Sequence, residues 1–186
     1  MFEAVSECRK CGKVVSFKEY EKSRFCPDCG TFLLHPRRPK CWIFQFNPSM
    51  YRWFDWIEEK RDREQWLVSQ HAREIHKRDK AAIWASGEKA GFYAIGEVET
   101  DPSRKPLNKE QEKYWVNSLD VYKFEEKSSV IIRYVKLFVD SPLLAKECLR
   151  DPLLRGMEIL KQPQGTNFPL TIEQWNRILE LINNKD

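Results

Sequence analysis

The sequence predicts an α+β protein in two parts, a small cysteine-rich unit at the N-terminus and a larger domain of strands and helices. Four of the six cysteines lie in two close pairs within the first 30 residues. From residue 41 onward, short aromatic and β-branched runs alternate with segments of helical periodicity. A chain of 186 residues with 41% hydrophobic content can bury one ordinary core beside such an appendage. We therefore expect a unit at residues 1–34, a linker at 35–40 and a domain at 41–186.

The paired cysteines predict a metal site in the first unit. They follow the pattern C-x2-C-x14-C-x2-C, and Gly12 and Gly30 come directly after the second cysteine of each pair. Two intervening residues let a turn wrap a metal ion, and glycine permits the positive φ that this turn needs. The ligands of one structural zinc ion would be Cys8, Cys11, Cys26 and Cys29. Four thiolates complete a tetrahedral site and leave no position for a catalytic water.

Residues 1–40 are mildly basic, with nine Lys and Arg against five Asp and Glu. Zinc bound by four thiolates would lower this excess to about +2, well short of the basic patch of a dedicated duplex binder. We expect Phe32, Leu33 and Leu34 to cover the metal site. The remaining cysteines, Cys41 and Cys148, fit the role of small buried hydrophobes.

The sequence favours a soluble protein of the cytoplasm. No apolar run reaches the roughly 20 residues of a membrane-spanning helix, and the first residues lack the apolar centre of a signal peptide. In a reducing compartment, close cysteine pairs indicate metal ligands before disulfides. We therefore expect no membrane partner.

The first half of the large domain is predicted to form a strand, two helices and a hairpin. Residues 41–46 (CWIFQF) predict a strand buried on both faces, and residues 47–49 (NPS) predict its end and a helix cap. Apolar residues at helical spacing predict a helix in residues 50–60, and residues 66–78 (WLVSQHAREIHKR) predict a second short one. Residues 81–86 (AAIWAS) and 92–99 (FYAIGEVE), joined by a glycine-bounded loop, predict a hairpin.

The second half combines a long excursion, a long strand and a helical end. Residues 99–114 are polar and contain prolines, which predicts a functional or mobile loop. The β-branched run at 128–140 predicts a strand that crosses the sheet. Pro142 and Pro152 predict the starts of short helices, and residues 171–174 (TIEQ) form a capping box before the last helix.

Catalytic patterns are scarce, which argues against an enzyme. The sequence shows no serine elbow, phosphate loop or dinucleotide fingerprint. His71 and His76 lie five residues apart, which is off the spacing that helical metal ligands favour, and surface or capping roles fit them better.

Five ordered segments resemble the EVE domain, a family of the PUA-like superfamily that is similar to the YTH readers of methylated RNA. They are the strand WIFQFNP, the isolated Trp66 before His71 and Ile75, the segments IWASG and AGFYAIGEV, and the terminal TIEQWNRIL. The resemblance covers residues 41–182 and implies a mixed β-barrel with flanking helices. The sequence departs from the family pattern at Arg78, which replaces glycine in an expected Gly-Asp turn, and at residues 99–115, which match nothing.

The resemblance implies a deep pocket for a flipped, modified nucleobase. Aromatic walls, a few polar groups and a floor shaped around an added methyl group would serve that task. The residues that would build it are Phe46, Asn47, Trp66, Trp84, Ser86, Gly87, Tyr114 and Trp115. Some of these also fit ordinary structural roles, because Trp84 alternates with Ile83 in a buried strand and Asn47 precedes a helix.

The resulting hypothesis is a non-enzymatic reader of a modified base, in DNA more than in RNA, that serves in defence against modified foreign DNA. A nuclease or ATPase on another chain would then be its partner. Two alternatives stay open at this stage. The domain could be a PUA-like RNA-binding protein that acts on tRNA or rRNA, or the ribbon could be a protein adaptor with the large domain as its scaffold.

Overall fold

The computed structural model describes residues 2–59 and 61–185, which fold into two compact units, residues 1–39 and 40–186. The predicted α+β class is confirmed, and residue 60, at the end of the predicted helix 50–60, lies outside the described residues. None of the helices within these ranges is long and apolar enough to cross a membrane.

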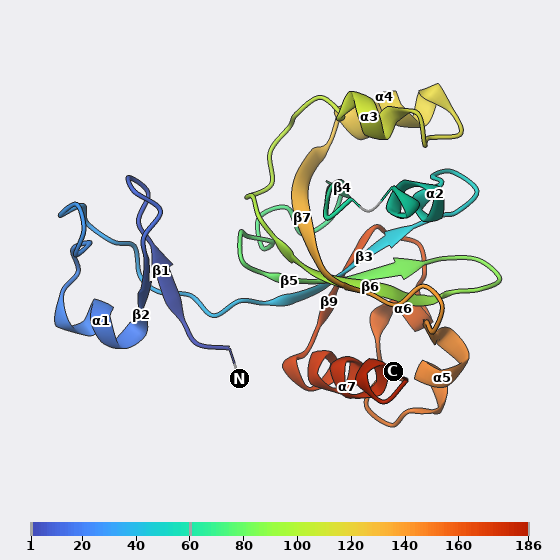
Figure 1. Cartoon of the computed structure of the whole chain (residues 1–186). Coiled ribbons are helices and arrows are strands. Elements are labelled where there is room, and N and C mark those ends of the chain that lie inside the picture. Colours follow the sequence, from blue (N-terminus) through green and yellow to red (C-terminus); the bar gives the residue numbers. More distant parts are fainter. Residues whose placement is uncertain (1, 60, 186) are drawn as a thin grey trace. The chain divides into compact units, whose positions relative to one another are not determined.

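The first unit is built around the four cysteines. Strands β1 (Val5–Glu7) and β2 (Val14–Ser16) pair antiparallel, and helix α1 (Phe17–Lys22) follows directly (Figure 1). The sequence analysis missed α1, which starts at a capping box between Ser16 and Glu19. Of the apolar tail expected over the metal site, Leu33 alone is buried, whereas Phe32 is 57% and Leu34 48% exposed. Alternation along an extended segment turns these two neighbours outward.

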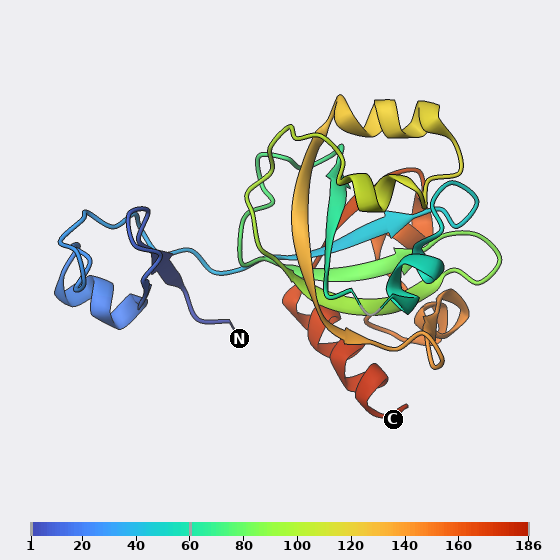
Figure 2. The same ribbon diagram turned by 45° about the horizontal axis from the view of Figure 1, so that its top comes forward.

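The second unit contains one strongly curved sheet, in which the order is β4-β7-β6-β5-β3-β9 and β8 pairs with β6 (Figure 2). The strands are β3 (Cys41–Phe46), β4 (Arg63–Val68), β5 (Lys80–Ala85), β6 (Gly91–Val98), β7 (Ser128–Leu137), β8 (Leu143–Leu144) and β9 (Asn167–Leu170). The neighbours β3 and β5 run parallel, and the other named pairs are antiparallel. The predicted strand at 41–46 and hairpin at 81–99 are therefore confirmed.

Helices flank both sides of this sheet. They are α2 (Trp53–Glu58), α3 (Lys109–Glu112), α4 (Ser118–Glu125), α5 (Ala145–Arg150), α6 (Glu158–Lys161) and α7 (Ile172–Asn183). Figures 1 and 2 show α3 and α4 on one side of the sheet and α7 on the other. The predicted capping box of Thr171 and Gln174 is present at the start of α7. Asn47 does not cap α2, because its side chain accepts from Ser49 N while α2 begins at Trp53.

Two predicted segments are corrected. Residues 66–78 form no helix: Trp66 lies in β4 opposite Val130 of β7, and turns follow as far as β5. Pairing with the long β7 strand outweighs the weak helical pattern of this segment. Residues 99–114 are packed rather than loose, because Leu107, Gln111 and Tyr114 are buried.

The turn before β5 explains the departure at Arg78. Its φ is 75°, in the left-handed region where glycine is the natural residue. The next residue, Asp79, is fully buried and accepts hydrogen bonds from Lys40 N at 2.9 Å, Trp42 Nε1 at 2.9 Å and His76 N at 3.0 Å. The anchored carboxylate holds the turn, so Arg78 adopts a backbone conformation that its side chain disfavours.

We expect Arg78→Gly to raise the free energy of unfolding of the large unit by about 0.5–1 kcal/mol, because glycine adopts a positive φ without the steric strain of a Cβ atom. Chemical denaturation of both proteins measures the difference. Arg73→Gly is the matched control: Arg73 does not have a positive φ, so glycine there should lower stability. A loss of stability in Arg78→Gly as large as in the control would contradict the strain at residue 78.

Candidate functional site

The four paired cysteines come together in a cluster whose spacing suits the ligands of a metal ion. Their sulfur atoms all lie within 4.8 Å of one another, and Cys8–Cys29 and Cys11–Cys26 are 3.5 Å apart. Both separations exceed the roughly 2.05 Å of a disulfide bond. They are close to the roughly 3.8 Å between ligands of a tetrahedral zinc–thiolate site with bonds of about 2.3 Å.

The two halves of the cluster have the same backbone design. Gly12 N donates to Cys8 O and Gly30 N donates to Cys26 O, each at 2.9 Å. Gly12 has a φ of 74° and Gly30 a φ of 68°, which is the left-handed conformation that the sequence predicted for both glycines. The donor set and the repeated turns fit a closed, structural metal site.

The large unit contains a pocket of about 460 Å³ between the sheet, α4 and the segment 163–166. This volume is in the range of small-molecule sites in proteins. Five residues that the sequence analysis selected line it. They are Phe46, Asn47, Trp66, Ser86 and Trp115. Chain segments up to 120 residues apart in sequence close its sides, since Gln45 Nε2 of β3 donates to Gly165 O at 2.9 Å.

Trp66 belongs both to the pocket and to the core. Its ring lines the pocket but is 5% exposed, and it packs edge-on against Phe44 and Phe46 at centroid distances of 6.2 and 6.1 Å. Its Nε1 donates to the Tyr134 hydroxyl at 3.0 Å. One ring therefore serves both as a wall of the pocket and as part of the core.

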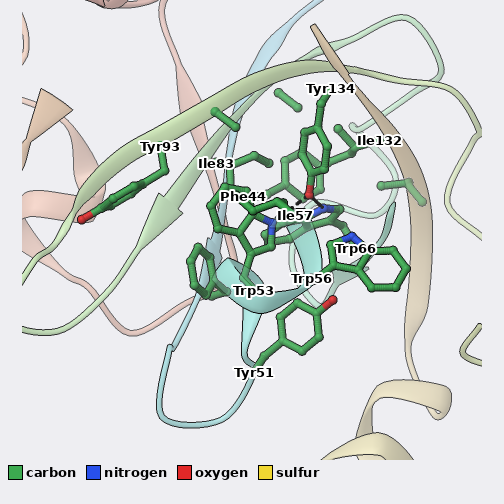
Figure 3. Close-up of a cluster of buried hydrophobic side chains, with 14 of the residues drawn as sticks. Phe44, Tyr51, Trp53, Trp56, Ile57, Trp66, Ile83, Tyr93, Ile132 and Tyr134 are labelled. Carbon is green, nitrogen blue, oxygen red and sulfur yellow. Dashed lines mark hydrogen bonds between the residues drawn. The ribbon is translucent and has the colours of Figure 1, made fainter. Parts of the chain in front are cut away.

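A buried carboxyl group fixes the floor of the pocket. Glu64 is 3% exposed and accepts from the Tyr51 and Tyr134 hydroxyls, from Trp53 Nε1 at 3.0 Å and from Gln111 Nε2 at 3.3 Å. Trp53 Nε1 also donates to the Tyr134 hydroxyl, at 2.9 Å (Figure 3). The Glu64 carboxyl and the Tyr134 hydroxyl thus tie together the rings that pack beneath the pocket.

Burial raises the pKa of Glu64 to about 8, although hydrogen bonds from Tyr134, Tyr51 and Trp53 oppose the rise. Burial, with the nearby Glu64 charge, also raises the pKa of the Tyr51 hydroxyl and the pKa of the Tyr134 hydroxyl well above their ordinary value. Both hydroxyls therefore stay protonated and donate toward the Glu64 carboxyl group. The sequence analysis missed Glu64, because a single glutamate in the polar run DREQ carries no local signal of burial.

Three selected residues lie away from the pocket. Trp84 faces the other side of β5 from Ile83 and packs against Phe92 at 4.7 Å, because alternate residues of a strand point to opposite faces. Gly87 is exposed in the turn between β5 and β6, with a φ of 94°. Tyr114 packs edge-on against Trp56 at 5.3 Å, and its hydroxyl bonds to Glu59.

Charged side chains and two unpaired polar atoms belong to residues that line the pocket. Asp120 and Lys123 of α4, which are 3.2 Å apart, and Lys127 after it lie along one side. Gln45 Oε1 and Trp115 Nε1 are buried and have no hydrogen-bond partner in the described protein. One acceptor and one donor among the lining residues are therefore not used by the fold.

The sequence matches the EVE domain family over residues 40–181. The chain belongs to the EVE-domain family. Its fold resembles those of several solved proteins. A hypothetical protein from Leishmania major is 16% identical, with a TM-score of 0.59 over 78% of this chain and 96% of that one. A protein from Agrobacterium tumefaciens is 20% identical, with a TM-score of 0.55 over 77% of this chain and 92% of that one.

A third similar structure, human THYN1 in complex with DNA containing 5-methylcytosine, is 14% identical. Its TM-score is 0.56, and the match covers 77% of this chain and 98% of THYN1. At these identities the likeness concerns the fold, and it agrees with the mixed sheet and flanking helices that the sequence predicted. No curated protein matches the chain.

We expect the stability of the EVE domain to fall as the pH rises from about 5 to about 8. The folded state raises the pKa of Glu64 from 4.5 to about 8, so in this interval it binds a proton that the unfolded chain has released. The Glu64→Gln variant has no carboxyl group to titrate at this position, so its stability should depend less steeply on pH. Denaturant melts at several pH values measure both slopes.

Glu147→Gln is the control for this experiment, because Glu147 has a lowered pKa despite partial burial, owing to Lys185 and the Leu144 amide. Its contribution is lost only as the pH falls through that lowered pKa, below the interval tested. The Glu147→Gln slope should therefore equal that of the wild type. Identical slopes in wild type and Glu64→Gln would show that Glu64 does not titrate as inferred.

Proposed function

We propose that the EVE domain binds a nucleobase that is flipped out of a nucleic acid, with methylated DNA as the preferred target. The observation that carries this proposal is the aromatic-walled pocket of about 460 Å³, with Trp66, Phe46 and Trp115 among its lining. The complex of human THYN1 with DNA containing 5-methylcytosine, in a related fold, supports the choice of ligand. The proposed role is binding, without a chemical step.

The chemistry of the lining suits a base. Aromatic rings provide stacking worth about 1–3 kcal/mol per base. At the mouth, Lys123 and Lys127 offer positive charge to the phosphates beside the base.

Selectivity for one methyl group should be modest. A buried methyl contributes about 0.8 kcal/mol, which corresponds to roughly a fourfold difference in Kd. A larger preference would need a recess that excludes water or hydrogen bonds that the unmodified base cannot make. The binding measurement below therefore includes methylated and unmodified forms of each strand.

Filling the pocket should abolish this binding. Ser86 lines the pocket and is partly exposed, so Ser86→Phe should place a ring in it with little effect on folding. We expect a loss of at least about tenfold in affinity, because a flipped base that cannot enter loses its stacking. Fluorescence anisotropy with 5-methylcytosine, 5-hydroxymethylcytosine, 6-methyladenine and unmodified oligonucleotides, in DNA and RNA, measures it.

Ser141→Phe is the matched control, since Ser141 is exposed and does not line the pocket. It should bind like the wild type. Equal affinity of Ser86→Phe and wild type for every oligonucleotide would refute the pocket as a base site. Stronger binding to RNA than to DNA would support the proposal of a PUA-like RNA-binding protein instead.

We further propose that the four-cysteine cluster holds one structural zinc ion that keeps the first unit folded. The close approach of the four sulfurs, all within 4.8 Å of one another, and the paired left-handed glycines support this assignment. Apart from the metal ligands, the core of this unit consists of Val15, Tyr20 and Leu33, which is too little apolar surface to hold so short a chain alone.

We expect one equivalent of zinc per chain in the purified protein, and loss of both metal and fold in the first unit of Cys11→Ser. Metal binding and folding are coupled in such small units, so removing one ligand removes both. Metal analysis and amide exchange of residues 2–39 measure the two effects. Cys41→Ser is the control, since Cys41 lies in β3 of the other unit and should leave the zinc content unchanged. A zinc content of one in Cys11→Ser would overturn the ligand assignment.

A further inference from the structure

Helix α4 has two faces with different surroundings. On one face Phe124 is buried and packs edge-on against Trp115 at 5.6 Å, and both residues line the pocket. Leu119, 64% exposed, and Tyr122, 62% exposed, lie about 140–160° around the helix from Phe124. The same helix therefore walls the pocket and carries an uncovered apolar row.

One end of this apolar row borders a residue of the pocket lining. Leu119 precedes Lys123 by four residues, and side chains at that spacing are neighbours on a helix surface. Lys123 lines the pocket, so Leu119 borders the lining although it does not itself belong to it. Tyr122 follows Leu119 by three residues and extends the row along the same flank.

Helix α4 is held firmly enough to present this row. The segment before it pairs with the segment before α2, since Arg52 N donates to Tyr114 O and Val116 N donates to Met50 O, each at 2.9 Å. The Asn117 side chain caps the helix by accepting from Leu119 N at 2.9 Å. The exposure of Leu119 is therefore set by a fixed backbone.

Exposed apolar side chains can replace the stacking that a duplex loses when one base flips out. When a base leaves a duplex, the neighbouring base faces in the stack lose their apolar contact. Proteins that distort duplex DNA commonly insert apolar side chains between base steps to restore it. Positive charge beside the pocket fits the same partner, because Lys127 lines the pocket and its ammonium group makes no ion pair or hydrogen bond to another residue in the described ranges.

We propose that α4 is the duplex-facing wedge of the EVE domain: Leu119, flanked by Tyr122, packs into the base stack beside the nucleotide that enters the pocket. This inference rests on the proposed function and adds that the natural target is double-stranded DNA. The pocket then holds the flipped base while α4 fills the gap that the base leaves.

Leu119→Ala tests this role directly. We expect affinity for a duplex with a central 5-methylcytosine to fall about tenfold, the effect of losing one buried leucine side chain. Affinity for the same strand without its complement should stay within about twofold, because a single strand has no gap to fill. Leu149→Ala is the matched control, since Leu149 is a 56% exposed leucine of α5, which contributes nothing to the pocket. It should change neither affinity.

A duplex with the fluorescent base 2-aminopurine beside the methylcytosine reports the wedge itself. Base flipping by the wild type should raise the fluorescence of the 2-aminopurine. The Leu119→Ala variant should change the fluorescence that is reached when the duplex is saturated with protein. An unchanged duplex affinity in Leu119→Ala, or an equal loss for duplex and single strand, would overturn the wedge. If the wild type binds single strands and no duplex, the wedge fails while the proposed function stands. If it binds no oligonucleotide, both fail.

Discussion

The hydrogen bonds to the buried Glu64 carboxyl are the interaction on which the rest of the EVE domain depends. One carboxyl group accepts hydrogen bonds from Tyr51, Trp53, Tyr134 and Gln111, which come from three separate segments of the chain. A carboxyl group this deep is tolerated because its oxygens accept these hydrogen bonds and because burial raises its pKa to about 8, so that it is uncharged at neutral pH.

That network explains how an aromatic pocket can stay open. Large rings collapse onto one another unless something else fixes them, and here Trp66 and Trp53 are both held through the Tyr134 hydroxyl. Trp66 can then present part of its ring to the pocket while the remainder packs against Phe44 and Phe46. A preformed pocket lowers the conformational entropy that a ligand must remove on binding.

The segment 99–115 shows how an unmatched stretch of sequence serves the same pocket. Gln111 donates to both Glu64 Oε1 and Gln65 O, and Gln65 Oε1 accepts from Asn108 N at 3.0 Å. These contacts fasten α3 to β4 and bring Trp115 and α4 to the pocket mouth. The wall and the proposed wedge are therefore positioned by polar contacts with the strand that carries Glu64.

The sequence by itself determined the features that depend on neighbours along the chain. These include the left-handed glycines after each cysteine pair, the hairpin of β5 and β6, and the capping box of α7, because turn and cap geometry is set within a few residues. It also identified the family and five of the pocket residues. It placed Trp66 next to a helix, however, because the pairing partner that makes β4 a strand lies far away at Val130.

Only the tertiary structure decided the floor, the mouth and the orientation of the rings. Trp84 and Ile83 are adjacent in sequence, and which of them faces the pocket side depends on the register of β5 between β3 and β6. Glu64 and Tyr134 are 70 residues apart, and nothing local marks either as buried. Burial and long-range hydrogen bonds arise when separate segments pack together, so no spacing in the sequence encodes them.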